Sequence, residues 1–257
     1  MIKVINVRAG KNISFLFNYA HFICDCVFPE FAMNFHSNEK INKIIRLHKP
    51  RQSIGNFKDL YKRILDKDSE ELYEKEFEKL NVPKSLVLNK YIIPPQMFIN
   101  FRNYIWKRFK VTNDPSFPKI ILVKRGNYKL QYKDIENDIN MKSGSARREI
   151  SDVDLLESKM KNKFGNKFQS VILQNYSFEK QVKYFFNANL IVMAHGAGLS
   201  NMFFCKEKTN VIEVKCNREW NFFNHISKNL HINHIKCKDN IQIILSYINI
   251  FLNKKVI

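Results

Sequence analysis

The order of apolar and polar positions predicts alternating strands and helices in the second half of the chain. Short apolar runs predict strands at 119–124, 168–173, 190–194, 210–214 and 232–236. Apolar residues at helical spacing predict helices at 152–163, 177–186, from Leu199, at 219–229 and at about 240–253. This alternation is typical of a parallel sheet with helices packed on its faces.

The first half has a less regular pattern. It predicts strands at 2–8, 43–49 and 89–95, an aromatic-rich helix at 14–35 interrupted near Pro29, charged helices within 56–81 and a basic helix at 97–109. The segment NDPSFP at 113–118 is the strongest linker candidate. We therefore predict an N-terminal domain at 1–115, a C-terminal domain at 116–240, and a helix at 241–257 that packs back on the body.

Composition adds a strong positive charge to this picture. The formal net charge is +19 in 257 residues, which favours anionic partners such as nucleic acid, an anionic membrane or phosphate-bearing substrates. The lysines are spread over the whole chain, which a general compositional bias explains equally well.

Targeting signals and cysteine spacing bear on the compartment. The N-terminal stretch has no apolar leader region, and no uncharged stretch of about 18 residues predicts a membrane span. The five cysteines have no C-x-x-C spacing, which argues for free thiols and against a zinc site. We expect a cytoplasmic protein, with peripheral membrane contact through its basic surface as an option.

A glycine-rich turn carries the first chemical signal. The apolar run LIVMA at 190–194 stops at His195, and Gly196-Ala197-Gly198 follow. Ligands of parallel α/β sheets bind at the carboxyl ends of strands, and free N–H groups at a helix start suit a diphosphate. Glycine permits close approach and positive φ angles, and His195 can donate a hydrogen bond to a phosphate or sugar hydroxyl. A purely structural turn with a structural histidine is the alternative.

Charged residues near other strand ends extend this candidate site. Glu213 lies inside an apolar strand, where two ribose hydroxyls or a lysine would suit it as partner. Arg125 directly follows the strand predicted at 119–124. Arg147 and Arg148 lie in a loop that contains serine and glycine and precedes a helix. Arginine binds phosphate oxygens in a bidentate manner, although a solvated basic loop is an equally simple interpretation.

These motifs together resemble glycosyltransferase family 61. The resemblance rests on HGAGLSN followed by VIEV, on the loop RREISDVDL at 147–155, and on NYAHFICDCVFPEF at 18–31. The aromatic segment EWNFFNHISKNLHINH at 219–234 also resembles the family, and the resemblance spans roughly residues 14–236.

The resemblance implies an α/β fold of GT-B type, in which two Rossmann-like domains face each other across a cleft. It also implies an inverting transfer from a nucleotide diphosphate sugar, UDP-linked xylose or GlcNAc for example, to a hydroxyl of a glycan or glycoconjugate. No cofactor and no metal ion are expected. The expected donor-binding residues are Arg125, Arg147, Arg148, His195, Gly196, Ala197, Gly198, Ser200, Asn201 and Glu213.

The base that takes the acceptor proton is expected on the aromatic-rich helix. His21 and Asp25 are four residues apart, which places them on one helical face. Asp25 is favoured as the base with His21 positioning it, and the reverse assignment stays open. A buried pair that only stabilises the helix is the structural alternative.

Two other classes of protein agree with part of the sequence. A basic nucleic-acid-binding protein without catalytic activity fits the charge, and an aromatic content of 13% permits base stacking. However, no nucleic-acid-binding signature is present, and the aromatics lie mainly in apolar runs, so no nucleic-acid partner is expected. A degenerate transferase acting as a scaffold is disfavoured by the intact His21, Asp25, His195 and Glu213.

Overall fold

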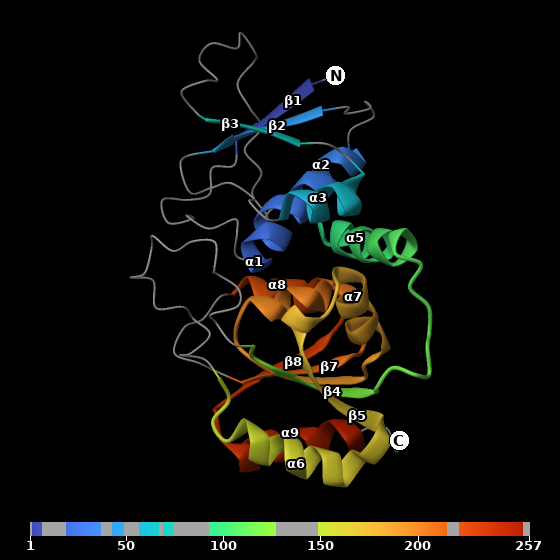
Figure 1. Ribbon diagram of the computed structural model, residues 1–257, viewed down its shortest axis with the longest axis vertical. Helices are drawn as coiled ribbons and strands as arrows, with labels where there is room; N and C mark the ends of the chain where they lie inside the picture. Colours follow the sequence, from blue (N-terminus) through green and yellow to red (C-terminus); the bar gives the residue numbers. More distant parts are fainter. Residues whose placement is uncertain are drawn as a thin grey trace. The chain divides into compact units, whose positions relative to one another are not determined.

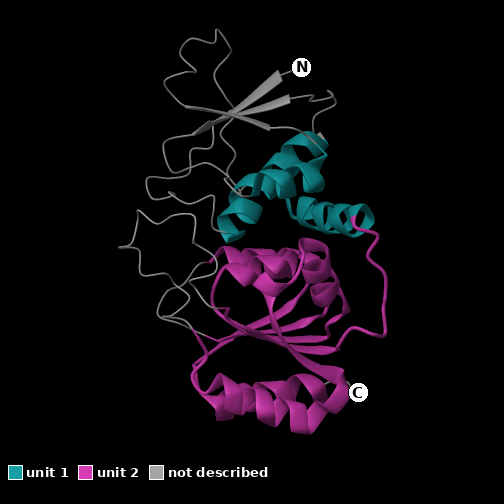
Figure 2. Ribbon diagram, in the orientation of Figure 1, with its two compact units in different colours: residues 1–108 teal, residues 109–257 magenta. Residues whose placement is uncertain are grey.

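The computed structural model describes residues 2–6, 19–36, 43–48, 57–66, 69–73, 93–126, 149–214 and 221–253. The chain forms two compact units, residues 1–108 and 109–257 (Figure 2). The predicted linker at 113–118 lies inside the second unit. There, the backbone N–H of Asp114 donates to Oδ1 of Asn187 over 3.0 Å.

The first unit contains a three-stranded parallel sheet. Its strands β1 (Ile2–Asn6), β2 (Lys43–His48) and β3 (Ser69–Tyr73) pair in that order. The prediction of charged helices within 56–81 is confirmed for α3 (Lys58–Leu65) but wrong for 69–73, which form β3. Asp66 adopts a left-handed conformation that caps α3, and pairing with β2 then makes 69–73 a strand despite its charged residues. The predicted strand at 89–95 lies mainly outside the described residues.

A helical segment at 19–36 supplies much of the core of this unit. It runs through α1 (Tyr19–His21), the π-helix η1 (Phe22–Val27) and α2 (Phe28–His36) without the break that was predicted near Pro29. A proline ring clashes with the carbonyl four residues earlier in an α-helix, and the wider π turn before Pro29 relieves that clash. Phe28 packs on Phe98 of α5 (Pro95–Arg108), with 4.5 Å between ring centroids.

The second unit is built on a five-stranded parallel sheet. Its strands are β4 (Ile120–Lys124), β5 (Phe168–Ile172), β6 (Leu190–Ala194), β7 (Asn210–Val214) and β8 (Asn233–Cys237), in the order β5-β4-β6-β7-β8. Figure 1 shows α6 (Val153–Phe164) and α9 (Ile241–Asn253) on one face, and α7 (Phe178–Asn187) and α8 (Phe222–Asn229) on the other. The prediction of a parallel α/β sheet wrapped by helices is confirmed for this unit.

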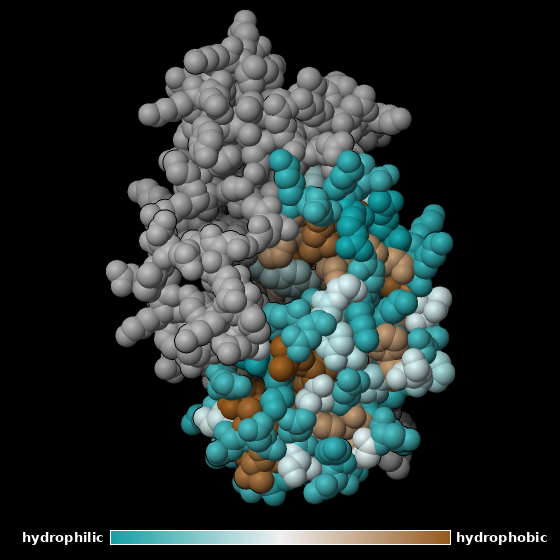
Figure 3. All heavy atoms as spheres, in the orientation of Figure 1, coloured by the Kyte–Doolittle hydropathy of each residue, from teal (hydrophilic) through white to brown (hydrophobic). Residues whose placement is uncertain are grey.

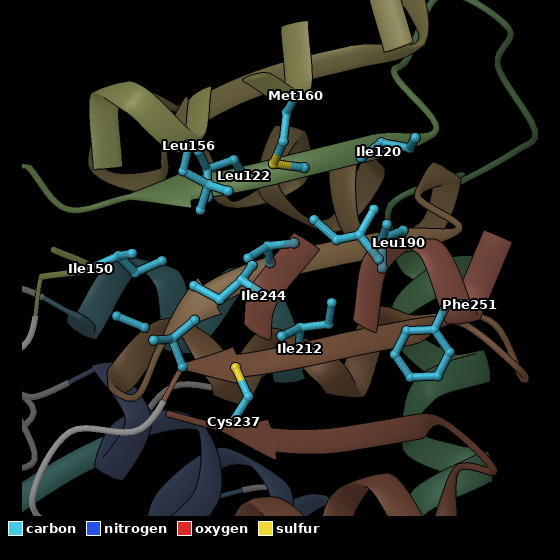
Figure 4. Close-up of a cluster of buried hydrophobic side chains, with 14 residues drawn as sticks. Ile120, Leu122, Ile150, Leu156, Met160, Leu190, Ile212, Cys237, Ile244 and Phe251 are labelled. Atoms are coloured by element: carbon cyan, nitrogen blue, oxygen red, sulfur yellow. The ribbon is translucent and has the colours of Figure 1, made fainter. Parts of the chain in front are cut away.

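The core of the second unit explains why its strands are apolar runs. Ile120, Leu122, Leu190 and Ile212 point from the sheet toward α6 and α9 (Figure 4). Alternate residues of the same strands are buried on the side of α7 and α8, so the central strands are shielded from water on both faces. All five residues of β6 are buried.

The outer surface of the second unit is mainly hydrophilic in the view of Figure 3, with hydrophobic residues in small groups between. Leu155 of α6 and Ile250 of α9 are among the exposed apolar side chains, at 51% and 47% exposure. Scattered exposed apolar residues are normal for a folded protein. Each helix within the described ranges is too short or too polar to span a bilayer.

Candidate active site

The order of strands in the second unit singles out one place on the sheet. From β4 the chain moves outward to β5, and it then returns past β4 to β6 on the other side. Open α/β sheets bind ligands outside the carboxyl ends of the strands at such a reversal. Arg125 follows β4 and His195 follows β6. Both residues therefore lie at the reversal point.

The turn after β6 is held by the sheet and by a short helix. The N–H of His195 donates to the carbonyl of Val214 over 2.9 Å, which extends the pairing of β6 with β7 by one residue. The next segment is the 3-10 helix η7 (Ala197–Phe204), so the helix predicted from Leu199 is present but begins two residues earlier and has 3-10 geometry. Its bonds span three residues, as from Leu199 N–H to the Gly196 carbonyl, and the Ser200 hydroxyl bonds back to Ala197.

A buried carboxylate bridges two histidines at this turn. Oε1 of Glu213 lies 2.5 Å from Nδ1 of His195, and Oε2 lies 2.8 Å from Nε2 of His234. The three side chains are 1%, 5% and 3% exposed, respectively. Burial raises the pKa of the Glu213 carboxyl, but hydrogen bonds and charge interactions with both rings outweigh it and lower the pKa to about 2. Glu213 is therefore ionised at neutral pH.

The charge of Glu213 determines the tautomer of His195. An ionised carboxylate only accepts hydrogen bonds, so Nδ1 of His195 carries the proton that faces it. The Nε2 atom of His195 has no hydrogen-bond partner within the described part of the chain. The ring also packs edge-on against Phe223 of α8, with centroids 5.6 Å apart. The ring is thus held through Nδ1 and by Phe223.

This geometry changes the role expected for Glu213. The sequence predicted that its carboxylate would hold ribose hydroxyls, with a lysine as the alternative partner. In the structure both oxygens contact histidines and the side chain is 1% exposed. Glu213 therefore orients His195, and neither predicted partner is found at its oxygens.

Arg125 lies against the glycine turn. Its Nη2 atom donates to the carbonyl oxygen of His195 over 2.5 Å. A Cβ atom on Gly196 would collide with this guanidinium. The backbone of Gly196 is extended, with φ of 162°, so the glycine provides room and not a left-handed angle. The close approach predicted for a ligand is made here by the guanidinium of Arg125.

The other residues of the turn stabilise it from inside. Ser200 and Asn201 are fully buried, and the Asn201 amide donates to the side chain of Gln181 over 3.2 Å. A Cβ on Gly198 would meet the side chains of Met193 and Leu173. The burial of Ser200 and Asn201 does not support the predicted direct contact of these two residues with a donor. Ala197, the first residue of η7, is partly exposed.

Lys124, the last residue of β4, is held by α6. Its Nζ atom lies 2.7 Å from both Asp154 and Glu157. The hydrogen bonds that Lys124 donates to Asp154 and to Glu157 raise the pKa of Lys124. Lys124 therefore braces the end of β4 next to Arg125. The predicted arginines of the following loop, Arg147 and Arg148, lie outside the described residues.

The predicted pair in the first unit is formed. Nδ1 of His21 lies 2.6 Å from Oδ2 of Asp25, with the side chains 30% and 8% exposed. The two residues are on successive helical turns, and Asp25 belongs to the π-helix η1. Short π-helical segments occur frequently at functional sites. A histidine bonded to a largely buried carboxylate can accept or relay a proton.

One residue of the network escaped the sequence analysis. His234 lies in the strand predicted at 232–236 and at the end of the segment 219–234 that resembles the family, but the sequence assigned it no role. In β8, His234 and Lys236 share a face because alternate strand residues point to the same side. That periodicity, next to a strand with a buried Glu213, was the signal available in the sequence. No cluster of His, Cys, Asp and Glu side chains in the described ranges is arranged to hold a metal ion.

Comparison with known proteins agrees with this class of α/β fold and identifies the family. The model of the family Glycosyltransferase 61 matches residues 19–212, which is most of the chain. The chain belongs to glycosyltransferase family 61, and membership implies glycosyltransferase activity. The match includes His21, Asp25, Arg125 and the turn after β6. No curated protein matches the chain, and nothing supports the nucleic-acid-binding alternative.

Proposed function

We propose that the protein is an inverting glycosyltransferase that uses a nucleotide diphosphate sugar. The donor is UDP-linked, with xylose or GlcNAc as the sugar, and the acceptor is a hydroxyl of a glycan or glycoconjugate. The observation that carries the proposal is the pairing of His195 with Glu213 beside Arg125, at the strand reversal of a family 61 chain.

The donor diphosphate binds at the turn after β6. Leaving-group charge develops on the diphosphate as the bond to the sugar breaks, and positive groups or N–H donors must stabilise it. Arg125, the Nε2 side of His195 and the first amides of η7 lie at this edge of the sheet. Arg147 and Arg148 would add positive charge. These groups supply the charge that a divalent metal ion supplies in other transferases.

The proton of the acceptor goes to the pair on the first unit. The acceptor oxygen forms a bond to the anomeric carbon while the bond from that carbon to the diphosphate oxygen breaks. The acceptor proton passes to Asp25, which His21 orients through their 2.6 Å contact. Because attack comes from the side opposite the leaving group, this single displacement inverts the anomeric configuration.

A nucleotide panel tests the proposal. The thermal midpoint of the full chain is measured with UDP, GDP and CMP and with the corresponding sugars, each with and without EDTA. A ligand that binds only the native state stabilises it by RT ln(1 + L/Kd), where L is the ligand concentration, so the midpoint rises with the logarithm of L once L exceeds Kd. A shift with UDP or a UDP-sugar that survives EDTA supports the proposal. Shifts with short oligonucleotides alone would overturn it.

A further inference from the structure

We propose that His234 is a positioning residue of the donor site. It fixes the carboxylate of Glu213, and Glu213 in turn fixes the imidazole of His195. The proposal rests on the proposed function only in placing the donor at His195. The hydrogen-bonded series itself stands on the structure of the second unit.

The sheet register places His234 beside Glu213. Val211 pairs with His234 and Glu213 pairs with Lys236, so His234 is the diagonal neighbour of Glu213 across β7 and β8. Residues two apart along a strand share a face, so both side chains lie on the side covered by α7 and α8. Their Nε2–Oε2 distance is 2.8 Å, and both side chains are at most 3% exposed.

The far side of His234 is anchored to a helix. Its Nδ1 atom lies 3.2 Å from the hydroxyl of Ser227 on α8, and that hydroxyl lies 3.0 Å from the carbonyl of Asn224. The series therefore runs from Ser227 through His234 and Glu213 to His195. It connects α8, β8, β7 and the turn after β6.

A second hydrogen bond on Glu213 has a definite geometrical effect. The terminal torsion of a glutamate has a broad, twofold energy profile, so a carboxylate held at one oxygen can still rotate. With His195 on Oε1 and His234 on Oε2, the plane of the carboxylate is fixed. That plane fixes the direction in which Nδ1 of His195 points and hence where Nε2 is presented.

Two substitutions separate positioning from simple packing. His234→Leu fills the space but removes the donor to Oε2. His234→Gln keeps an N–H donor at about the reach of Nε2. The control is His231→Asn, at an exposed position with a left-handed backbone that asparagine accepts. Each variant is labelled with ¹⁵N-histidine, and His195→Phe assigns the His195 signals among the seven histidines.

The first measurement needs no ligand and reads the His195 ring by long-range ¹H–¹⁵N correlation. Wild type, His234→Gln and His231→Asn are expected to show the proton of the neutral ring on Nδ1. His234→Leu is expected to keep the proton on Nδ1, because the Glu213 carboxylate still accepts it, but to change the ¹H and ¹⁵N shifts of that N–H group, because the plane of the carboxylate is no longer fixed. The second measurement is the Kd of UDP by calorimetry. His234→Leu is expected to weaken it on the order of tenfold, as loss of an outer-shell hydrogen bond does at metal-bound histidines, and His234→Gln to restore it.

Each result has a definite meaning. An unchanged His195 N–H signal in His234→Leu overturns the proposal, whatever the UDP data show. A changed signal without UDP binding to wild type leaves the positioning role intact and removes UDP as the donor nucleotide. If His234→Leu does not fold, Ser227→Ala takes its place, because it removes the contact to Nδ1 of His234. In that variant an unchanged His195 signal and an unchanged Kd would again overturn the proposal.

Discussion

Nδ1 of His195 lies 2.5 Å from Oε1 of Glu213, and this contact joins the turn after β6 to the neighbouring strand β7. The contact occupies Nδ1 of His195 and leaves Nε2 as the ring nitrogen that can meet the proposed donor. Substitutions of this pair and of its neighbours Arg125 and Gly196 are expected to change UDP binding and the stability of the folded protein.

His195→Phe keeps an aromatic ring against Phe223 but removes both ring nitrogens. We expect UDP binding to be lost, because the ring no longer presents a polar atom. We also expect about 1–3 kcal/mol of lost stability, because Oε1 of Glu213 is left buried without its partner. Calorimetry with UDP and urea unfolding measure the two effects. His231→Asn is the matched control, and equal losses in both variants would contradict the prediction.

The lowered pKa of Glu213 predicts how the stability of the folded protein changes in acid. Its pKa is lowered from the usual 4.5 to about 2 in the folded state, so the folded protein is stabilised above pH 4.5. This contribution is lost as the pH falls from about 4.5 toward 2 and amounts to roughly 3 kcal/mol.

Urea unfolding of wild type and Glu213→Gln between pH 7 and 3 measures this contribution. The variant should be less stable at pH 7, and the difference between the two proteins should shrink as the pH falls. A difference that is independent of pH would show that folding does not lower the pKa of Glu213.

Gly196→Ala should act through Arg125. The new Cβ collides with the guanidinium, while the extended backbone at this position accepts alanine. We expect weaker UDP binding in Gly196→Ala and in Arg125→Ala. Because both variants disturb one contact, we expect a coupling energy of about 1 kcal/mol or more in the double mutant.

Gly198→Ala is the matched control for that cycle, because its Cβ meets only the side chains of Met193 and Leu173. It should cost about 1–3 kcal/mol of stability through overpacking and leave the coupling with Arg125 near zero. If the effects of Gly196→Ala and Arg125→Ala on the free energy of UDP binding were strictly additive, Gly196 would not act through the Arg125 guanidinium.

Asp25→Asn should separate turnover from donor binding. The amide cannot take the acceptor proton, so we expect the rate of sugar transfer to fall about 10²–10⁴-fold. The Kd of UDP should not change, because the proposed donor residues belong to the second unit. Asp59→Asn, at an exposed position of α3, serves as the control. A variant that transfers sugar at the wild-type rate would exclude Asp25 as the base.

The sheet of the second unit could be predicted closely because local and tertiary preferences agree there. The predicted strands 190–194 and 210–214 match β6 and β7 residue for residue. Both strands are buried on their two faces, so segments rich in apolar residues are also what the fold requires. The 3-10 geometry of η7 could not be predicted, because it depends on side-chain bonds of Ser200 and Asn201.

The site was predicted less completely than the sheet. The i,i+4 spacing of His21 and Asp25 is a local pattern, and the structure brings the two side chains together. The role of Glu213 depends on His234, 21 residues later, and on the register of β7 with β8. A sequence pattern can indicate that a buried glutamate needs partners, but only the pairing of strands identifies them.

The measurement that decides most is calorimetric titration of UDP into the wild-type chain, His195→Phe and Arg125→Ala, all in EDTA. We predict binding of one UDP to wild type and severe weakening in both variants, with Asp25→Asn binding as wild type does. Binding of UDP that neither His195→Phe nor Arg125→Ala weakens would show that the donor site is not at the turn after β6.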